Sequence, residues 1–147
     1  MYELGYKYVV IDDCWQMKER DAGGHVVPDP TKFPNGMKNL SDSIHSQGLL
    51  FGMYSSAGTL TCGGFPAGLG HEVTDANDFA SWGIDYLKYD NCYNKGVPAR
   101  KRYGDMSKAL RDTTKTTGRE IFFSICSWGD EQIADWGYTV GNSWRTT

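Results

Sequence analysis

The stretch GIDYLKYDNC, residues 83–92, decides the fold class, because it reads as one strand that follows a glycine and ends in polar residues. Side chains alternate along a strand, so Lys88, Asp90 and Cys92 would share one face. A lysine and an aspartate on one face of a strand fit two hypotheses. In the first, the two residues form a buried ion pair that only stabilises the fold. In the second, the carboxylate of Asp90 is placed to react with a substrate.

Strand-like stretches recur along the chain, separated by segments with helical periodicity. The strand ends, at Asp13, Tyr54, Asp90 and Cys126, follow one another at steps of 41, 36 and 36 residues. Such a period predicts a series of βαβ units and therefore a parallel sheet. The expected strands are 8–11, 49–54, 84–90 and 121–125, and the expected helices are 37–47, 76–82 with Asp75 as its N-cap, and 101–117.

The polar residues of this α/β pattern collect at the carboxyl end of every expected strand. A (β/α)8 TIM barrel and a doubly wound sheet both fit the element order, but only a barrel brings all its strand ends to one mouth. A complete barrel takes about 250 residues, so we expect residues 1–147 to be a fragment of a single catalytic barrel domain, truncated at both ends. It would hold roughly strands 2 to 5 and the start of strand 6.

Composition excludes some classes of function. The net charge is −3 with both signs interleaved, so the basic stripe of a nucleic-acid-binding protein is not expected. No apolar run approaches the roughly 18 residues that span a bilayer, so we expect a soluble domain without a membrane partner. The five Trp and nine Tyr suit sugar binding, because they combine a ring face with a hydrogen-bonding group, but they suit a packed core equally well.

The four cysteines, Cys14, Cys62, Cys92 and Cys126, are too far apart for a zinc or CxxC redox motif. They are disulfide partners in a secreted protein or buried thiols in a cytosolic one, and their spacing leaves both readings open. The three histidines lie away from the strand ends. Neighbouring residues of a strand point to opposite faces, so Asp12 and Asp13 would not converge on a metal ion. No metal site is therefore expected.

Carboxylates at strand ends with aromatic residues nearby remain as the candidate chemistry. Phosphate-binding glycine motifs and the GxSxG elbow are absent from the sequence. Pairs of carboxylates carry out glycoside hydrolysis, and Asp90 is the best single candidate for the nucleophile. Lys88 on the same face would keep the Asp90 carboxylate ionised, as a nucleophile requires. The alternative is a Lys–Asp pair that serves only the barrel core.

The sequence as a whole resembles the α-galactosidases of glycoside hydrolase family 27, the melibiase-type enzymes. The resemblance runs along nearly the whole chain, in order and at plausible spacing. It rests on the stretches YVVIDDCWQ (8–16), RDAGG (20–24), PDPTKFPNGMKNL (28–40), IHSQGLLFGMYSSAGTLTCGGFPAGLG (44–70), DFASWGIDYLKYDNCYN (78–94), RYGDMSKAL (102–110), GREIFFSICSWG (118–129) and NSWR (142–145).

The resemblance implies a role for each charged candidate. Asp90 matches the nucleophile that forms a covalent glycosyl-enzyme. Asp12 and Asp13 match the pair that binds the 6- and 4-hydroxyls of galactose. Lys88 matches a lysine that is hydrogen-bonded to ring hydroxyls, and Arg145 matches an arginine that acts near the 2- and 3-positions.

Other positions match the family's substrate-binding region. Tyr54 corresponds to a tyrosine that lines the pocket near the nucleophile, and Trp128 is a further substrate-binding position. Cys62 and Cys92 match a disulfide beside the sugar, which implies an oxidising compartment: extracellular, vacuolar or lysosomal. Cys14 matches a cysteine whose partner lies upstream of this chain.

The implied activity is that of a retaining exo-glycosidase that releases terminal α-D-galactosyl residues from galacto-oligosaccharides, galactomannans or galactolipids, with no metal or organic cofactor. The family's acid/base aspartate would stand four residues after Arg145, at position 149, beyond Thr147. We therefore expect the 147-residue chain by itself to be inactive or nearly so.

Three alternatives stay open. A serine at Ser127 resembles the α-N-acetylgalactosaminidases of the same family, in which a smaller residue makes room for an acetamido group. A β-L-arabinopyranosidase would recognise the same hydroxyl pattern. A non-catalytic galactose-binding remnant would keep Asp12, Asp13 and Lys88 without turnover.

Overall fold

The computed structural model describes residues 2–147, with the side chain of Tyr2 left out of the description. Five strands form one parallel sheet whose spatial order, β1-β2-β3-β4-β5, is the order along the chain. The strands are β1 (Tyr8–Val10), β2 (Leu50–Ser56), β3 (Tyr86–Asp90), β4 (Phe122–Cys126) and β5 (Ser143–Trp144), and the helices are α1 (Gly36–His45), α2 (Glu72–Ser81), α3 (Ala99–Thr117) and the short α4 (Ile133–Trp136), with 3₁₀ turns at Tyr2–Leu4, Asp130–Gln132 and Gly137–Thr139.

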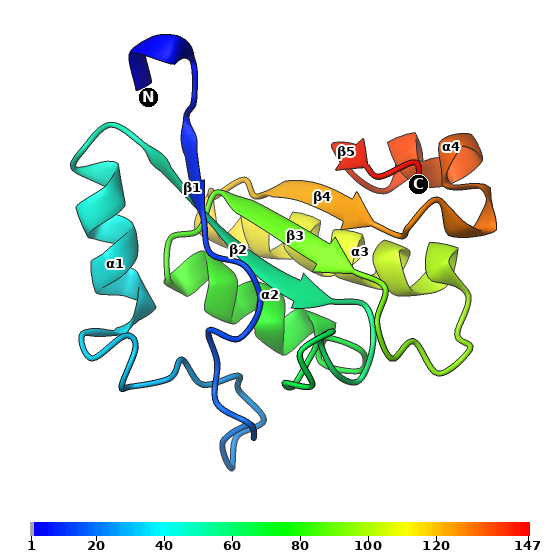
Figure 1. Cartoon of the computed structure of the whole chain (residues 1–147), viewed down its shortest axis with the longest axis horizontal. Helices are drawn as coiled ribbons and strands as arrows, with labels where there is room; N and C mark the ends of the chain where they lie inside the picture. The colour runs from blue at the N-terminus through cyan, green and yellow to red at the C-terminus, as the bar shows by residue number, and fades with distance from the viewer. Residues whose placement is uncertain (1) are drawn as a thin grey trace.

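The three long helices lie on one face of the sheet, so the molecule has a helix layer and a strand layer (Figure 1). Sequential parallel strands with helical crossovers on one side are the repeating unit of a (β/α)8 barrel, in which the sheet coils until it closes. The described residues form part of such a barrel. None of their helices is long and apolar enough to cross a membrane.

The core lies between the sheet and the helices, where alternate strand residues point. Phe51, Met53, Leu87 and Tyr89 are almost fully buried there. The long helix α3 packs Tyr103 against this layer, with its ring centroid 5.8 Å from that of Tyr89. Alternate burial on a parallel sheet covered by helices is what the period of two in the strand sequences predicts.

The other face of the sheet carries aromatic residues near the amino ends of the strands. The rings of Tyr86 and Phe122 stack with centroids 5.4 Å apart, and Tyr8 packs beside them. A Cβ atom at Gly52 would lie 2.8 Å from Val10 and 3.0 Å from the Tyr86 ring. Only glycine therefore lets these side chains meet across β2.

Two local expectations differ from the structure. Helix α2 begins at Glu72, so Asp75 lies inside the helix and is not its N-cap. The first strand ends at Val10, so Asp12 and Asp13 stand beyond it in an irregular segment. The parallel α/β sheet itself, with four clear strands and the start of a further one, is confirmed.

Candidate active site at the carboxyl ends of the strands

Asp90, the last residue of β3, accepts three hydrogen bonds although only 7% of its surface is exposed. Its Oδ2 accepts from the Tyr54 hydroxyl at 3.0 Å, and its Oδ1 accepts from the Asn91 backbone N–H at 2.9 Å and from the Trp128 indole at 2.8 Å. These three donors fix the position and the orientation of the Asp90 carboxylate.

Trp128 reaches Asp90 from an unusual backbone conformation. Its φ of 62° lies in the left-handed region, which a bulky residue rarely adopts. The next residue, Gly129, is also left-handed, and a Cβ atom there would lie 2.4 Å from the Thr146 carbonyl oxygen. The turn after β4 thus aims the indole at Asp90 and packs against the segment that follows β5. Strained turns of this kind concentrate at functional sites.

Lys88 lies on the face of β3 that carries Asp90, as expected, but its partner is different. Its Nζ donates to Asp12 Oδ2 at 2.7 Å, and among residues 2–147 no ion pair joins it to Asp90. Burial lowers the pKa of Lys88, yet the hydrogen bond and the charge of Asp12 outweigh it, so the pKa is raised. Of the two readings of this strand, the one in which Lys88 and Asp90 form a direct ion pair is not seen among these residues. A long lysine side chain reaches across β2 to the carboxylate beyond β1.

Asp12 and Asp13, which follow β1, have different partners. Asp12 faces Lys88, and its side chain is 63% exposed. Asp13 turns to the loop after β2, where its Oδ2 accepts from the Gly63 backbone N–H at 2.7 Å. Its Oδ1 accepts from the Cys14 backbone N–H at 2.7 Å. The two carboxylates are thus held by different loops.

Cys62 and Cys92 form a disulfide, with their Cα atoms 5.2 Å apart. It joins the loop after β2 to the segment just after Asp90. Both sulfur atoms and a carboxylate oxygen of Asp90 lie within 4.8 Å of one another. Sulfur atoms bonded to each other do not bind a metal ion as thiolates. This group of atoms is therefore a disulfide cross-link beside the candidate nucleophile.

The ends of β4 and β5 place two more residues, Cys126 and Arg145, near Asp90. Cys126, the last residue of β4, is a buried thiol whose pKa is raised, first by burial and then by the charge of Asp90, while the neighbouring Arg145 guanidinium acts in the opposite direction. The backbone N–H of Arg145 donates to the Ile125 carbonyl oxygen at 2.9 Å. Arg145 therefore stands at the same edge of the sheet as Asp90.

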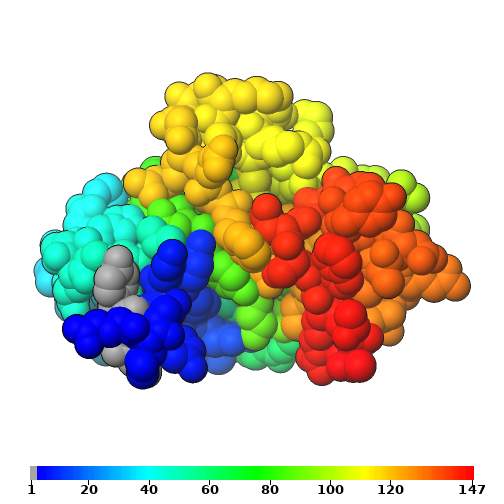
Figure 2. Space-filling view, turned by 90° about the horizontal axis from the view of Figure 1, so that it is seen from above, coloured from blue at the N-terminus to red at the C-terminus, as the bar shows by residue number. Residues whose placement is uncertain are grey.

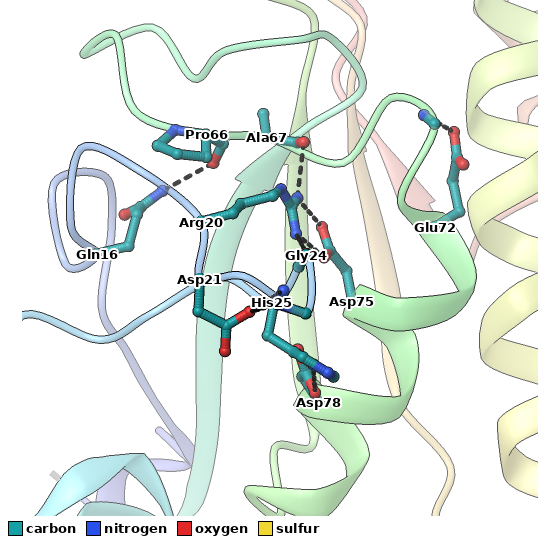
Figure 3. A network of polar contacts seen from close by, with 12 residues as sticks. Gln16, Arg20, Asp21, Gly24, His25, Pro66, Ala67, Glu72, Asp75 and Asp78 are labelled. Atoms are coloured by element: carbon teal, nitrogen blue, oxygen red, sulfur yellow. Dashed lines mark hydrogen bonds and ion pairs between the residues drawn. The ribbon is translucent and has the colours of Figure 1, made fainter.

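The loop after β2 is fixed from outside the cluster by a network that the sequence did not reveal (Figure 3). Arg20 donates to both carboxylate oxygens of Asp75, at 2.6 and 2.8 Å, and to the carbonyl oxygens of Gly24 and Ala67, each at 2.9 Å. The pKa of Asp75 is raised because burial outweighs the pull of Arg20. Arg20 and Asp75 are 55 residues apart, and no periodicity links such positions.

The same loop also packs tightly against β3 and the segment after it. A Cβ atom at Gly58 would lie 1.9 Å from the Cys92 carbonyl oxygen, and one at Gly68 would lie 2.1 Å from the Tyr89 hydroxyl oxygen. Any side chain at these two positions would push the loop outward. The disulfide and the Gly63 amide are carried by this loop, so its close approach places both at the strand ends.

Eight predicted site residues therefore gather at one edge of the sheet. A hollow of about 720 Å³ exists elsewhere, beside Tyr8, Phe122 and Tyr138, and none of the eight lines it. Seen from above, the N-terminal and C-terminal segments stand apart, with the segment that includes β3 in view between them (Figure 2). The eight are Asp12, Tyr54, Cys62, Lys88, Asp90, Cys92, Trp128 and Arg145. Asp13, the ninth predicted site residue, follows Asp12 and binds the Gly63 amide next to Cys62.

A parallel sheet with polar and titratable side chains at the carboxyl ends of its strands is the arrangement of a barrel enzyme. Comparison with known proteins narrows that class. The family model described as alpha galactosidase A matches residues 1–140, and the chain belongs to that family. The resemblance read from the sequence motifs is confirmed.

Individual relatives agree. The chain is 57% identical over 145 residues to alpha-galactosidase 2 of Arabidopsis thaliana, covering 98% of this chain and 36% of that protein. The crystal structure of alpha-galactosidase I from Mortierella vinacea matches with a TM-score of 0.93 and 52% identity, over 98% of this chain and 36% of that one. An α-galactosidase from Saccharomyces cerevisiae, solved with raffinose, matches with a TM-score of 0.92 and 49% identity, over 97% and 32%. The chain spans about a third of the length of these relatives.

Proposed function

We propose that this chain carries the nucleophile of a retaining exo-α-galactosidase. The observation that supports this most is the Asp90 carboxylate, which is buried at a strand end and held by three donors. The family membership and the relatives' names agree with it. The relative solved with raffinose points to a galactoside of that kind as the substrate class.

The proposed reaction has two displacements. An Asp90 oxygen forms a bond to the anomeric carbon while the bond to the leaving oxygen breaks, and a second carboxylic acid protonates that oxygen. Water then attacks the glycosyl ester, the same second group removes its proton, and Asp90 leaves as the carboxylate. Retention needs the two carboxyl groups about 5 Å apart. We place the second one four residues after Arg145, at position 149.

Sugar recognition is assigned to Asp12, Asp13 and Lys88, none of which is buried. Asp12 and Asp13 would accept hydrogen bonds from the 6- and 4-hydroxyls, and Lys88 would donate to ring hydroxyls. The Lys88 side chain is 31% exposed and that of Asp12 is 63% exposed, so the pair keeps room for a ligand. The raised pKa of Lys88 keeps it charged at neutral pH. Arg145, Tyr54 and Trp128 would bound the same site, with the Cys62–Cys92 disulfide beside it.

The disulfide also supports an oxidising compartment, either extracellular, vacuolar or lysosomal. Its loss would free the loop after β2 from the segment that follows Asp90.

The α-N-acetylgalactosaminidase alternative rests on Ser127. That side chain is fully buried and its hydroxyl has no partner among the described residues. It therefore makes no room at the exposed edge where the sugar would lie, and galactose is favoured. Hydrolysis rates on aryl α-galactoside, α-N-acetylgalactosaminide and β-L-arabinopyranoside decide among the three activities.

The activity is tested on the polypeptide as its gene encodes it. We expect hydrolysis of 4-nitrophenyl α-D-galactopyranoside with α-galactose as the first-formed product by NMR. Asp90→Asn should lower kcat by about a thousand-fold or more, because it removes a nucleophile that has no substitute. Asp42→Asn, which changes an exposed carboxylate on α1, is the control and should leave the rate unchanged.

β-Galactose as the first product would contradict retention, and an active Asp90→Asn variant would contradict the assignment of the nucleophile. Galactose binding without any turnover by the natural sequence would support the binding-remnant alternative.

A further inference from the structure

Arg102, on the first turns of α3, is a buried cation without a carboxylate partner. It is 1% exposed, and among the described residues no ion pair reaches it. Its guanidinium donates instead to three neutral oxygens: the carbonyl oxygens of Val97 at 2.6 Å and Ala57 at 2.9 Å, and the side-chain oxygen of Asn91 at 2.8 Å. Burial lowers the pKa of Arg102 from its ordinary value.

A buried charge at this position lowers the stability of the fold unless polar groups around it are held in place to accept its hydrogen bonds. Burying an unpaired ion is destabilising by several kcal/mol even after relaxation. Nearby inward positions on α3, Tyr103 and Met106, are filled by large side chains of the core. The planar guanidinium differs from them because it presents several donors in a fixed geometry. Arg102 can therefore fix three separate backbone segments at once.

The three acceptors lie where strands end. Ala57 follows β2, and its N–H donates to the Asp90 carbonyl oxygen at 2.8 Å. Asn91 follows β3 directly, and Val97 lies in the loop between β3 and α3. The amide nitrogen of Asn91 donates to the Ser127 carbonyl oxygen at 3.4 Å and to Asp130 at 3.2 Å. One guanidinium thus ties together the ends of β2, β3 and, through Asn91, β4.

Both donors to Asp90 Oδ1 belong to the segments that this arrangement joins. One is the backbone N–H of Asn91 itself, and the other is the indole of Trp128, the residue after Ser127. The side chain of Asn91 joins the two, since it accepts from Arg102 and donates to Ser127. Arg102 therefore contacts the segments after β2 and β3 directly, and the segment after β4 through Asn91.

We propose that Arg102 is a positioning residue that holds the Asp90 carboxylate and its Trp128 donor in register through Asn91. The inference rests on the proposed function of Asp90 as a nucleophile. A displacement of about 1 Å at a reacting group lowers a rate by about a hundred-fold. Loss of the Arg102 contacts should therefore affect turnover more than sugar affinity, which is assigned to Asp12 and Lys88.

The test is Arg102→Lys in the polypeptide as its gene encodes it, with Arg100→Lys as the matched control. Arg100 is the exposed arginine two residues earlier on the same helix. Lysine keeps the charge but lacks the planar guanidinium, whose three nitrogen atoms donate to the three acceptors. On 4-nitrophenyl α-D-galactopyranoside we expect kcat to fall about ten-fold or more, with KM within two-fold of the natural sequence. The control should change neither value.

An NMR readout separates positioning from a general loss of stability, and it does not depend on activity. The indole N–H signal of Trp128 should move in Arg102→Lys, because its bond to Asp90 changes. The signal of Trp15, whose indole donates to the Tyr54 carbonyl oxygen at 2.8 Å, is the internal reference and should stay. The proposal is overturned if the Trp15 signal shifts as much as the Trp128 signal, or if neither signal shifts.

Asn91→Ala serves as the second variant, and it decides the question if Arg102→Lys does not fold. It keeps the backbone donor but removes the link, so it should shift the Trp128 signal and lower kcat as Arg102→Lys does. The double variant should lose little more than the larger single loss, since both changes break one chain of contacts. Full additivity, or an unchanged Asn91→Ala protein, contradicts the proposal. If the natural sequence lacks α-galactosidase activity, the function of Asp90 fails, and the Trp128 signal still decides the role of Arg102.

Discussion

Tyr54 supplies the donor to Asp90 Oδ2, at the end of β2. The residue is buried, and burial together with the charge of Asp90 raises the pKa of its hydroxyl well above the ordinary value for tyrosine. The hydroxyl is therefore protonated, and able to donate, at neutral pH. Its aromatic ring also lies under Lys88, whose Nζ is 4.9 Å from the ring centroid.

Tyr54→Phe removes this hydroxyl and keeps the ring. A hydrogen bond to a charged group contributes about 1.5–3 kcal/mol, so we expect kcat on the aryl galactoside to fall by about ten-fold or more. Tyr93→Phe, at an exposed tyrosine three residues after Asp90, is the control and should leave kcat unchanged. An unaltered rate in Tyr54→Phe would show that this contact does not matter for turnover.

At this scale the sequence predicted which residues meet but not how they pair. Strand alternation placed Lys88 and Asp90 on one face, and the structure agrees. Alternation alone did not predict that Lys88 pairs with Asp12, because this contact depends on how β1 and β2 lie beside β3. Asn91 and Arg102 were missed because their contacts run between a helix and three loops.

The loop after β2, residues 57–70, is the element on which the candidate site depends. It carries Cys62 and the Gly63 amide that binds Asp13, and the Arg20–Asp75 pair holds its Ala67 carbonyl from behind (Figure 3). Asp75 looked like a helix cap in the sequence, because an aspartate before an apolar helical segment is the usual signal. The helix begins earlier, and Asp75 turns inward to a cation from a distant loop.

Arg20→Gln tests the role of this pair. Removing one partner of a buried ion pair destabilises a protein by about 3–5 kcal/mol, so we expect a loss of that order in the free energy of unfolding at pH 7. Without Arg20 the already raised pKa of Asp75 should rise further. The native state then binds a proton more readily than the unfolded state, so its stability falls as pH rises through the ordinary aspartate pKa and up to the folded value.

The loss caused by Arg20→Gln should therefore shrink as the pH is lowered, because protonated Asp75 no longer needs a cation. Denaturant unfolding at several pH values measures this. Lys101→Gln, which breaks an exposed pair with Asp105, is the control and should change stability by about 1 kcal/mol or less. A loss for Arg20→Gln that is small or independent of pH would contradict the role assigned to the pair.

For the whole molecule, the sequential parallel sheet has one face covered by helices and one face open (Figure 1). The open face carries Tyr8 and Val10, about two-fifths exposed, beside Tyr86 and Phe122. Apolar strand residues on that face suit the interior of a closed barrel. The regular spacing of Asp13, Tyr54, Asp90 and Cys126 predicted the parallel sheet, and the polar residues at every strand end favoured a barrel over a doubly wound sheet.

The proposed function also calls for a closed barrel. If Asp90 is the nucleophile, a retaining mechanism needs a second carboxyl group about 5 Å away at the same mouth. Asp90 would then form a covalent bond to the sugar, and this bond can be measured directly.

The decisive measurement is mass spectrometry of the protein, as its gene encodes it, after reaction with an activated fluorosugar of α-galactose configuration that forms the glycosyl ester faster than water breaks it. We expect one added fluoroglycosyl group, carried by the peptide that contains Asp90 and absent from Asp90→Asn. A label on any other residue, or retained turnover without any labelled intermediate, would contradict the assignment of Asp90 as the nucleophile.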